Sequence, residues 1–252
     1  MKFLPRSRSS VASSLTILLS SCLFAQSHDE SFRRLKMIQQ LMAAAEERTH
    51  HQVTYDPGYV GIAYPGGDVP SSSGVCSDEI VRIYRAVGID LQKEVHEDIL
   101  RDASAYPLSI WQQKKADSNI DHRRVPNLMA FFERNGESLR ITSRSADYSP
   151  SDVVAWDLGN GHTHIGMVAE RKTLFGRHLI LHNIGAGPKM EDVLFDWKII
   201  GHYRYLPPQK TQGEAMPGKW ERPGFAKARQ QGTGIQRAPD QHFKALWSPR
   251  IT

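Results

Sequence analysis

Residues 74–88 read GVCSDEIVRIYRAVG and combine a turn, a helical repeat and a single cysteine. One apolar face recurs at close to helical spacing: Val75, Ile80, Ile83, Tyr84 and Val87. Gly74 supplies a turn and Gly88 a stop, so the pattern places Cys76 in the first turn of a helix. The unpaired N–H groups and the positive dipole end there favour a thiolate, which is one way to build a nucleophile. The alternative is a small buried cysteine that packs a helix.

The first 25 residues have the composition of an export signal. Lys2, Arg6 and Arg8 precede the apolar run 11–24, and the stretch holds no acidic residue. The run is short for a membrane span, so we expect an exported, periplasmic protein that is soluble or tethered by its N-terminus. Two processing routes are open, namely cleavage near residue 25 and a lipid on Cys22 in the segment LSSC at 19–22.

Either route removes Cys22 from the folded domain and leaves Cys76 without an intramolecular partner. A single unpaired cysteine in an oxidising compartment is a chemical liability that calls for a reason. The compartment therefore favours a reactive thiol at Cys76 over inert packing.

The charge of the chain is unevenly distributed. Its net charge is +5 and its isoelectric point is about 9.2, but three basic residues lie in the leader and eight follow Leu206. Residues 26–206 keep 21 basic and 24 acidic side chains, so this part is mildly acidic and a nucleic-acid role for it is not expected. The segment 207–252 reads as a basic disordered tail that associates weakly with anionic membrane or wall polymers.

The periodicity of the chain changes from helical to strand-like near residue 150. Helices are predicted at 29–49, 74–88, 90–103 and 125–135, and the first is expected to brace the main domain through Phe32, Leu35, Ile38, Leu41 and Met42. Strands are predicted at 153–156, 165–168, 179–182 and 202–205. Helices followed by antiparallel strands indicate an α+β fold. The expected organisation is a signal peptide (1–25), an N-terminal helix (26–53), a catalytic domain (54–206) and the tail (207–252).

A cysteine nucleophile needs a base within hydrogen-bond reach and a third group that orients the base. His164 opens the run HIGMV, and His182 closes the next predicted strand. If these strands are adjacent and antiparallel, the two imidazoles are neighbours. His164 is the expected base and His182 the expected orienter, with Asn183 as the alternative orienter.

These residues resemble two families. The order of the cysteine helix, HIGMV and a polar strand end is similar to papain-like cell-wall cysteine peptidases of the NlpC type. That resemblance implies a papain-like fold, Tyr64 as a candidate oxyanion donor, and cleavage of an amide or peptide bond in peptidoglycan peptide stems. The segments YDP (55–57), GVC (74–76), DHRRVPNL (121–128), HNIG (182–185) and GHYRY (201–205) resemble, more closely, an exported bacterial family known as domain of unknown function 1287.

Several charged residues are candidates for binding a substrate. Asp78 stands where the NlpC type has glycine, and the cluster Asp121, His122, Arg123 and Arg124 could hold an anionic group. For the cluster, a helix cap with a buried ion pair is an equally good interpretation.

Two other functions remain open. One is a zinc-dependent hydrolase that uses His162, His164 and His182, which leaves Cys76 without a role. The other is a non-catalytic module that binds the cell wall. The cysteine hydrolase is the preferred hypothesis, and it needs neither a metal nor a cofactor.

Overall fold

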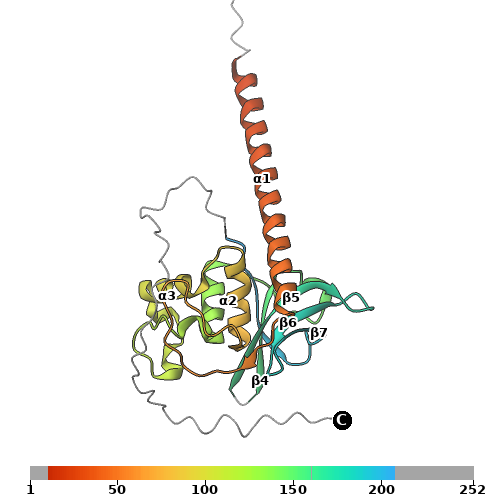
Figure 1. Ribbon diagram of the computed structural model, residues 1–252. Helices are drawn as coiled ribbons and strands as arrows, with labels where there is room; N and C mark the ends of the chain where they lie inside the picture. The colour runs from red at the N-terminus through yellow and green to blue at the C-terminus, as the bar shows by residue number, and fades with distance from the viewer. Residues whose placement is uncertain (1–10, 160, 208–252) are drawn as a thin grey trace, which may run out of the picture. The chain divides into compact units, whose positions relative to one another are not determined.

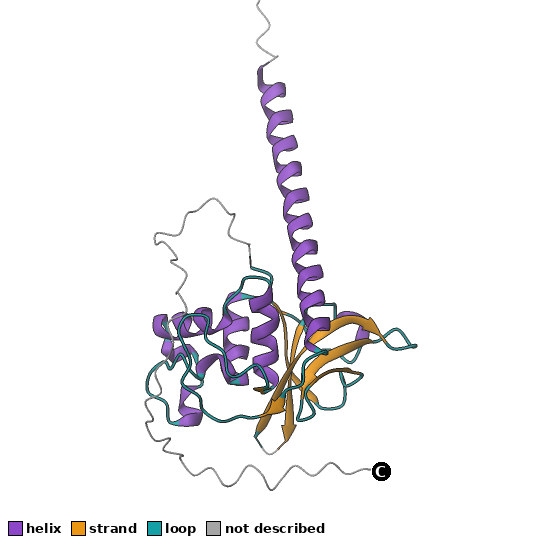
Figure 2. Cartoon of the chain, viewed as in Figure 1, coloured by secondary structure: helices purple, strands orange, loops and turns teal. Residues whose placement is uncertain are grey.

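The computed structural model describes residues 11–159 and 161–207 of the chain. The predicted tail from residue 208 onward and the first ten residues lie outside the described part, as do the side chains that precede His28. Within that part the chain forms four α-helices followed by antiparallel strands, so the predicted α+β class is confirmed (Figures 1 and 2). The helices are α1 (Val11–Arg48), α2 (Cys76–Ala86), α3 (Leu91–Arg101) and α4 (Val125–Asn135).

Short 3-10 turns and strands complete the described elements. The turns are η1 (Ala103–Ala105), η2 (Leu108–Trp111), η3 (Asp121–Arg123) and η4 (Ser145–Asp147). The main sheet has the order β3-β8-β4-β5-β6-β7, and all of its neighbouring strands are antiparallel. Its strands are β3 (Glu137–Ser138), β4 (Val153–Gly159), β5 (His162–Lys172), β6 (His178–Asn183), β7 (Pro188–Glu191) and β8 (Lys198–Arg204).

The two faces of the sheet carry different cores. Alternate residues of β5 and β6, including Ile165, Met167 and Leu181, pack with Cys76 and the helices in the larger cluster. The opposite face carries a smaller cluster of Tyr148, Val154, Trp156, Val168, Ile180 and Leu194. Because side chains alternate along a strand, the parity of a residue decides which core it enters.

Among the described side chains of α1, those buried against the domain lie in its C-terminal turns. Met37, Leu41, Met42 and Ala45 are buried in the larger cluster. Phe32 and Leu35, which the sequence placed on the packing face, are instead 68% and 61% exposed. The prediction that these two side chains brace the domain is wrong because both face solvent, although Arg34 between them bonds to Glu137 of β3 at 2.8 Å. None of the described helices is long and apolar enough to cross a membrane.

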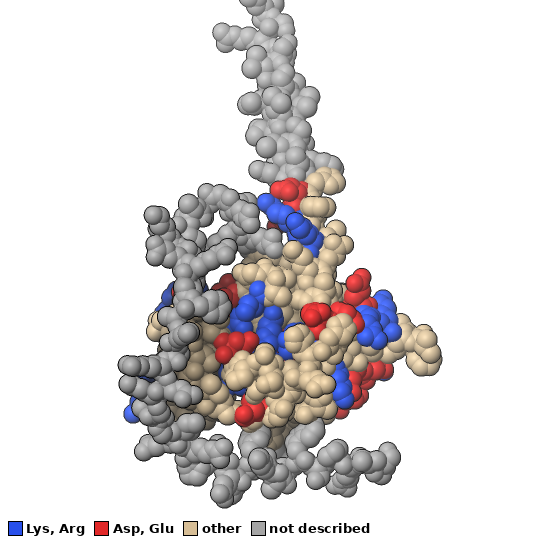
Figure 3. Space-filling view, viewed as in Figure 1, with Lys and Arg blue, Asp and Glu red and all other residues tan. Residues whose placement is uncertain are grey.

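The loop before α2 is anchored by a small parallel pair of strands. β1 (Thr54–Tyr55) pairs with β2 (Ser73–Gly74), with Tyr55 opposite Gly74. Gly74 has a φ of +156°, and a Cβ there would lie 3.0 Å from Arg82 and 3.2 Å from Asp78. A side chain at this position would therefore disturb the turn that leads into Cys76. On the face shown in Figure 3, basic and acidic side chains are interspersed over the described surface.

Candidate active site

Cys76 is the first residue of α2 and only 3% exposed. The turn is held by Asp78, whose carboxylate accepts the Val75 N–H at 2.7 Å. Three hydrogen-bond donors surround the sulfur, namely the backbone N–H groups of Ile165 and Ser77 and the hydroxyl of Tyr55. The predicted position in the first helical turn is therefore confirmed, and the thiol lies against β5.

The Ile165 N–H points toward β6, beyond the last residue pair that joins the two strands at this end, Met167 and Leu181. The Val168 N–H donates to Asp152 on the β4 side, and since N–H directions alternate along a strand, the Ile165 N–H points toward β6. The β5–β6 ladder pairs Met167 with Leu181, so its continuation would set Ile165 opposite Asn183, but the recorded pairing stops before that step. Cys76 therefore lies where the pairing of β5 with β6 ends, beside Ile165, and this place is called the seam below.

Two buried imidazoles, those of His164 and His182, lie close to each other, and His164 directly precedes Ile165 in the chain. His164 Nε2 lies 2.9 Å from His182 Nδ1, and His182 Nε2 lies 3.0 Å from Glu191 Oε2. Both rings are 1% exposed, whereas the Glu191 side chain is 44% exposed. His182 thus contacts the second nitrogen of His164, as predicted for an orienting residue, and Glu191 continues the line to the surface.

The rings lie on the face of the smaller cluster and are enclosed by indoles. His164 is the register partner of Trp156, with ring centroids 5.7 Å apart. Trp197 packs edge-on against both His164 and His182, at 5.7 and 6.2 Å. These apolar walls exclude water from the hydrogen bond between the imidazoles.

Burial holds both the thiol and the imidazole neutral. Desolvation raises the pKa of Cys76 to about 11, although the Ile165 N–H acts in the opposite direction. Desolvation also lowers the pKa of His164 to about 3, and His182 adds to that shift. In the described part of the chain no hydrogen bond joins Cys76 to His164. The sequence suggested a thiolate favoured by the helix terminus, but in this structure desolvation outweighs that effect.

Tyr55, rather than Tyr64, is the tyrosine beside the thiol. The hydroxyl of Tyr55 bonds to Cys76, and the pKa of this phenol is raised by burial and by the neighbouring sulfur. Tyr64 packs edge-on against His96 at 5.0 Å and is 41% exposed on the α3 side. The assignment of Tyr64 as an oxyanion donor is therefore corrected, because β1 brings the earlier tyrosine to the cysteine.

Asn183 is fully buried, and no hydrogen bond joins it to His164 in the described part of the chain. Its Oδ1 accepts the Gly185 N–H at 3.2 Å, and its Nδ2 has no hydrogen-bond partner among the described residues. By strand alternation it faces the same side as Leu181, whereas His182 faces the other. Of the two predicted orienting candidates, His182 is therefore the one that bonds to His164.

Asp78 and Arg123 form a buried ion pair that fastens the loop before α2. The guanidinium donates to the two Asp78 oxygens at 2.8 and 3.0 Å, and both side chains are 2% exposed. Arg123 also donates to the carbonyls of Gly58 and Asp56. Because internal partners occupy these groups, the structure gives both residues a scaffold role instead of the predicted contact with substrate.

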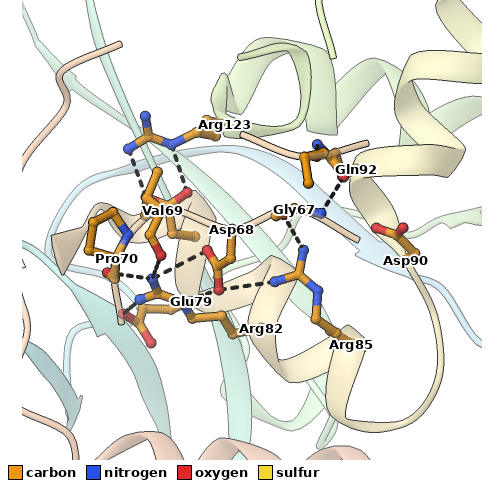
Figure 4. A network of polar contacts seen from close by, with 12 residues as sticks. Gly67, Asp68, Val69, Pro70, Glu79, Arg82, Arg85, Asp90, Gln92 and Arg123 are labelled. Carbon is orange, nitrogen blue, oxygen red and sulfur yellow. Dashed lines mark hydrogen bonds and ion pairs between the residues drawn. The ribbon is translucent and has the colours of Figure 1, made fainter. Parts of the chain in front are cut away.

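Further clamps hold the middle of the same loop. Arg82 donates to Asp68 and to the Ser73 carbonyl, and Arg85 reaches Asp68 and the Gly67 carbonyl. Figure 4 shows both guanidinium groups pointing toward Asp68, with Gln92 bonded to Gly67 from α3. The loop that positions Tyr55 is therefore rigidly bound to α2 and α3.

The remaining candidates for substrate binding are also engaged internally. Asp121 is fully buried and accepts from Gln113 and from the Asp117 N–H, and burial raises its pKa. His122 is 2% exposed, and burial lowers its pKa to about 3. Arg124 lies over the Trp111 ring at 4.2 Å and bonds to Gln113. The cluster therefore fits the alternative of a buried structural network.

The zinc alternative gains no support from the geometry. His162 is exposed at the start of β5, whereas His164 and His182 are enclosed. Among the described residues no group of three or more His, Cys, Asp or Glu side chains has a geometry that could hold a metal ion.

Sequence reasoning missed Glu191, Trp197 and the position of Tyr55. β7, which carries Glu191, has the sequence PKME and lacks the β-branched pattern of a strand. It forms at the edge of the sheet, where a proline at the first residue is tolerated. The local sequence indicated this strand only weakly, through a run of four residues after the turn at Gly185–Gly187.

A polar cleft of about 450 Å³ lies near β1 and the start of β7. It is lined by residues of two segments that meet beside β1, namely Thr49, His51, Gln52, Val53, Thr54 and Ser72 on one side and Ala186, Gly187, Pro188 and Lys189 on the other. Thr54 precedes Tyr55, and Pro188 is the register partner of Asn183. The cleft is therefore next to Tyr55 and Asn183, although neither residue lines it.

Comparison with known proteins identifies the family. The model of the family described as a domain of unknown function (DUF1287) matches residues 42–205. The chain belongs to this family. It is also 48% identical over 162 residues to a protein of Escherichia coli (strain K12) named "Uncharacterized protein YijF", which covers 64% of this chain and 78% of that protein. The matched region contains the cysteine helix, both imidazoles and Glu191, so the whole candidate site lies inside the family domain.

Proposed function

We propose that the chain is an exported cysteine-dependent hydrolase that cleaves an amide or peptide bond, with the peptide stems of peptidoglycan as its substrate. One observation carries the proposal, namely the line of hydrogen bonds from Glu191 through His182 to His164. It ends one residue from Ile165, whose N–H bonds to the Cys76 sulfur. The base is thus adjacent in sequence to the strand residue that borders the nucleophile, and its orienting group bonds to it.

The hydrogen bonds determine which nitrogen acts as the base. Glu191 is an acceptor when ionised, so His182 carries its proton on Nε2 and accepts at Nδ1. His164 must then donate from Nε2, which leaves its Nδ1 free to take a proton. The two bonds also stabilise the imidazolium that forms when His164 accepts that proton.

The resting neutral pair makes His164 a general base. With the thiol pKa raised and the imidazole pKa lowered, a standing thiolate and imidazolium are disfavoured. The thiol proton therefore moves to His164 as the sulfur attacks the substrate carbonyl, and the same proton then goes to the leaving amine. Cys76 and His164 lie on opposite faces of β5 in this structure, so this step requires the start of β5 to move and bring His164 Nδ1 to the sulfur.

The proposal includes a papain-like fold, an exported location and a wall polymer as partner. A cysteine at the start of a helix, followed by antiparallel strands that carry the two histidines, supports the fold. The leader composition supports export, with either plain cleavage or a lipid on Cys22. The basic segment 207–252 adds weak binding to anionic membrane or wall surfaces.

The decisive experiment is incubation of the mature protein with purified muropeptides, followed by mass measurement of the products. Wild type is expected to release a peptide or cleave a stem, whereas Cys76→Ala and His164→Ala lower the rate by about 10³-fold or more. His182→Ala is expected to be milder because it removes only an orienting group. Folding of each variant is checked by circular dichroism.

Two results would contradict this function. No change in any muropeptide mass would favour a non-catalytic wall-binding module or another amide substrate. Activity that a chelator abolishes and that survives Cys76→Ala would favour the zinc-dependent hydrolase over the cysteine hydrolase. A thiol alkylator should inactivate the wild type and label Cys76, and substrate should protect it.

A further inference from the structure

Asn183 has an unexplained buried donor. Its side chain is fully buried, and the amide oxygen is directed to the Gly185 N–H at 3.2 Å. This bond fixes the amide orientation and leaves the NH₂ group as the free end. That nitrogen has no partner in the described part of the chain, and an unmet buried donor costs free energy, so its retention calls for an explanation.

The position of Asn183 suggests what the free donor is for. The β5–β6 register, continued beyond the Met167 and Leu181 pair, sets Asn183 opposite Ile165. Ile165 bonds to the Cys76 sulfur, and Asn183 lies on the Leu181 side of the sheet, in the core that contains Cys76. The amide therefore borders the seam in which the thiol lies, on the side away from the imidazoles.

The polar cleft lies beside the strand that pairs with Asn183. Pro188, which lines the cleft, pairs with Asn183, and Thr54 on the opposite wall precedes Tyr55. The walls of the cleft are therefore next to Tyr55 in the chain and next to Asn183 in the sheet. His182 already orients His164, so Asn183 is not needed for that task.

We propose that Asn183 is a catalytic residue that donates its free amide N–H to the carbonyl oxygen of the substrate as that oxygen becomes negatively charged. The inference rests on the proposed function of Cys76. The sulfur bonds to the carbonyl carbon, the thiol proton passes to His164 once the start of β5 has brought that ring to the sulfur, and the C=O electrons move onto the oxygen that Asn183 holds. Collapse of this intermediate breaks the bond to the leaving group, which takes the proton from His164.

Two reactions of Cys76 separate this role from an effect on the thiol. Acyl transfer from 4-nitrophenyl acetate passes through an oxyanion, whereas alkylation by iodoacetamide displaces iodide at a saturated carbon and forms none. In the full chain, Asn183→Leu is expected to slow acylation about 100-fold and to leave alkylation within about twofold of wild type. Nitrophenolate release and labelling of Cys76 followed by mass spectrometry measure the two rates.

Two further variants keep the test independent of folding. Asn183→Asp retains an acceptor for the Gly185 N–H and removes the NH₂ group, so it is expected to show the same selective loss at alkaline pH. Asn127→Leu is the matched control, because Asn127 is also fully buried and has an unpaired amide oxygen, but it lies on α4. It should leave both rates unchanged.

Each outcome bears on a different claim. Equal losses in acylation and alkylation would show that Asn183 acts on the thiol, and unchanged acylation would show no role, so either result overturns the inference and leaves the hydrolase standing. If wild type shows no acylation that depends on Cys76, both the inference and the proposed function are wrong.

Discussion

Replacing Arg123 by methionine is expected to destabilise the domain by about 4–6 kcal/mol. Arg123 forms a bidentate salt bridge with Asp78, with N···O distances of 2.8 and 3.0 Å, and both side chains are 2% exposed. Removing one partner of a buried pair leaves an uncompensated charge and typically costs about 3–5 kcal/mol. The carbonyls of Gly58 and Asp56 also lose their donor, which adds about 1 kcal/mol in total because these residues are exposed to water.

Urea unfolding followed by circular dichroism measures this loss. A double-mutant cycle with Asp78→Leu isolates the pair, and the double variant should be more stable than Arg123→Met alone because no carboxylate is left unpaired. The matched control is Arg101→Met. Arg101 pairs with Asp98 at a similar distance, but its side chain is 64% exposed, so its loss should cost about 0–1 kcal/mol.

The same variant tests whether the loop protects the thiol. Arg123 fastens residues 56–58 next to Tyr55, so its loss should speed alkylation of the buried Cys76. A cost below about 1 kcal/mol for Arg123→Met, or a double variant no more stable than the single, would refute the claim that this pair is a buried and coupled clamp.

Three further predictions concern the line of histidines and its protonation. Glu191→Gln keeps a hydrogen-bond acceptor but loses the charge of a side chain that is 44% exposed. The value of kcat/KM on the substrate found with muropeptides should therefore fall about tenfold or less. A loss as large as that of His164→Ala would contradict this. Because burial raises the pKa of Cys76 to about 11, iodoacetamide labelling should rise about tenfold per pH unit from pH 7 to 10, and a plateau below pH 9 would show a standing ion pair instead. Burial lowers the pKa of His164 and of His122 from 6.5 to about 3, so the unfolded chain binds more protons between these values. Stability is then full above pH 6.5 and falls by about 1.4 kcal/mol per pH unit per histidine below it, and His122→Gln should reduce that slope in urea titrations.

The sequence predicted the elements whose signal is local. The apolar repeat of 74–88 and the turn at Gly74 placed Cys76 at a helix start, and the structure begins α2 at that residue. The run HIGMV and the strand end at His182 predicted neighbouring imidazoles, which lie 2.9 Å apart. These predictions succeeded because a helix start and the parity of a strand are decided by residues close together in the chain. Whether Cys76 and His164 act in catalysis stays a prediction.

Other features depended on pairings between distant segments. Tyr55, and not Tyr64, lies beside the thiol because β1 pairs with β2. Glu191 bonds to His182 because β7, an edge strand without a typical strand composition, pairs with β6. No local pattern encodes such pairings, since they are decided by which edges and cores remain to be covered once the rest of the chain has packed.

The protonation of the site likewise belongs to the tertiary structure alone. The residue types around Cys76 favour a thiolate through the helix terminus, and this much the sequence by itself determined. Desolvation is summed over every group that packs around the sulfur and the imidazole, from α2, β1 and β5 to the indole walls of Trp156 and Trp197. Only the folded chain brings those groups together, and their low polarity makes the neutral pair the resting state.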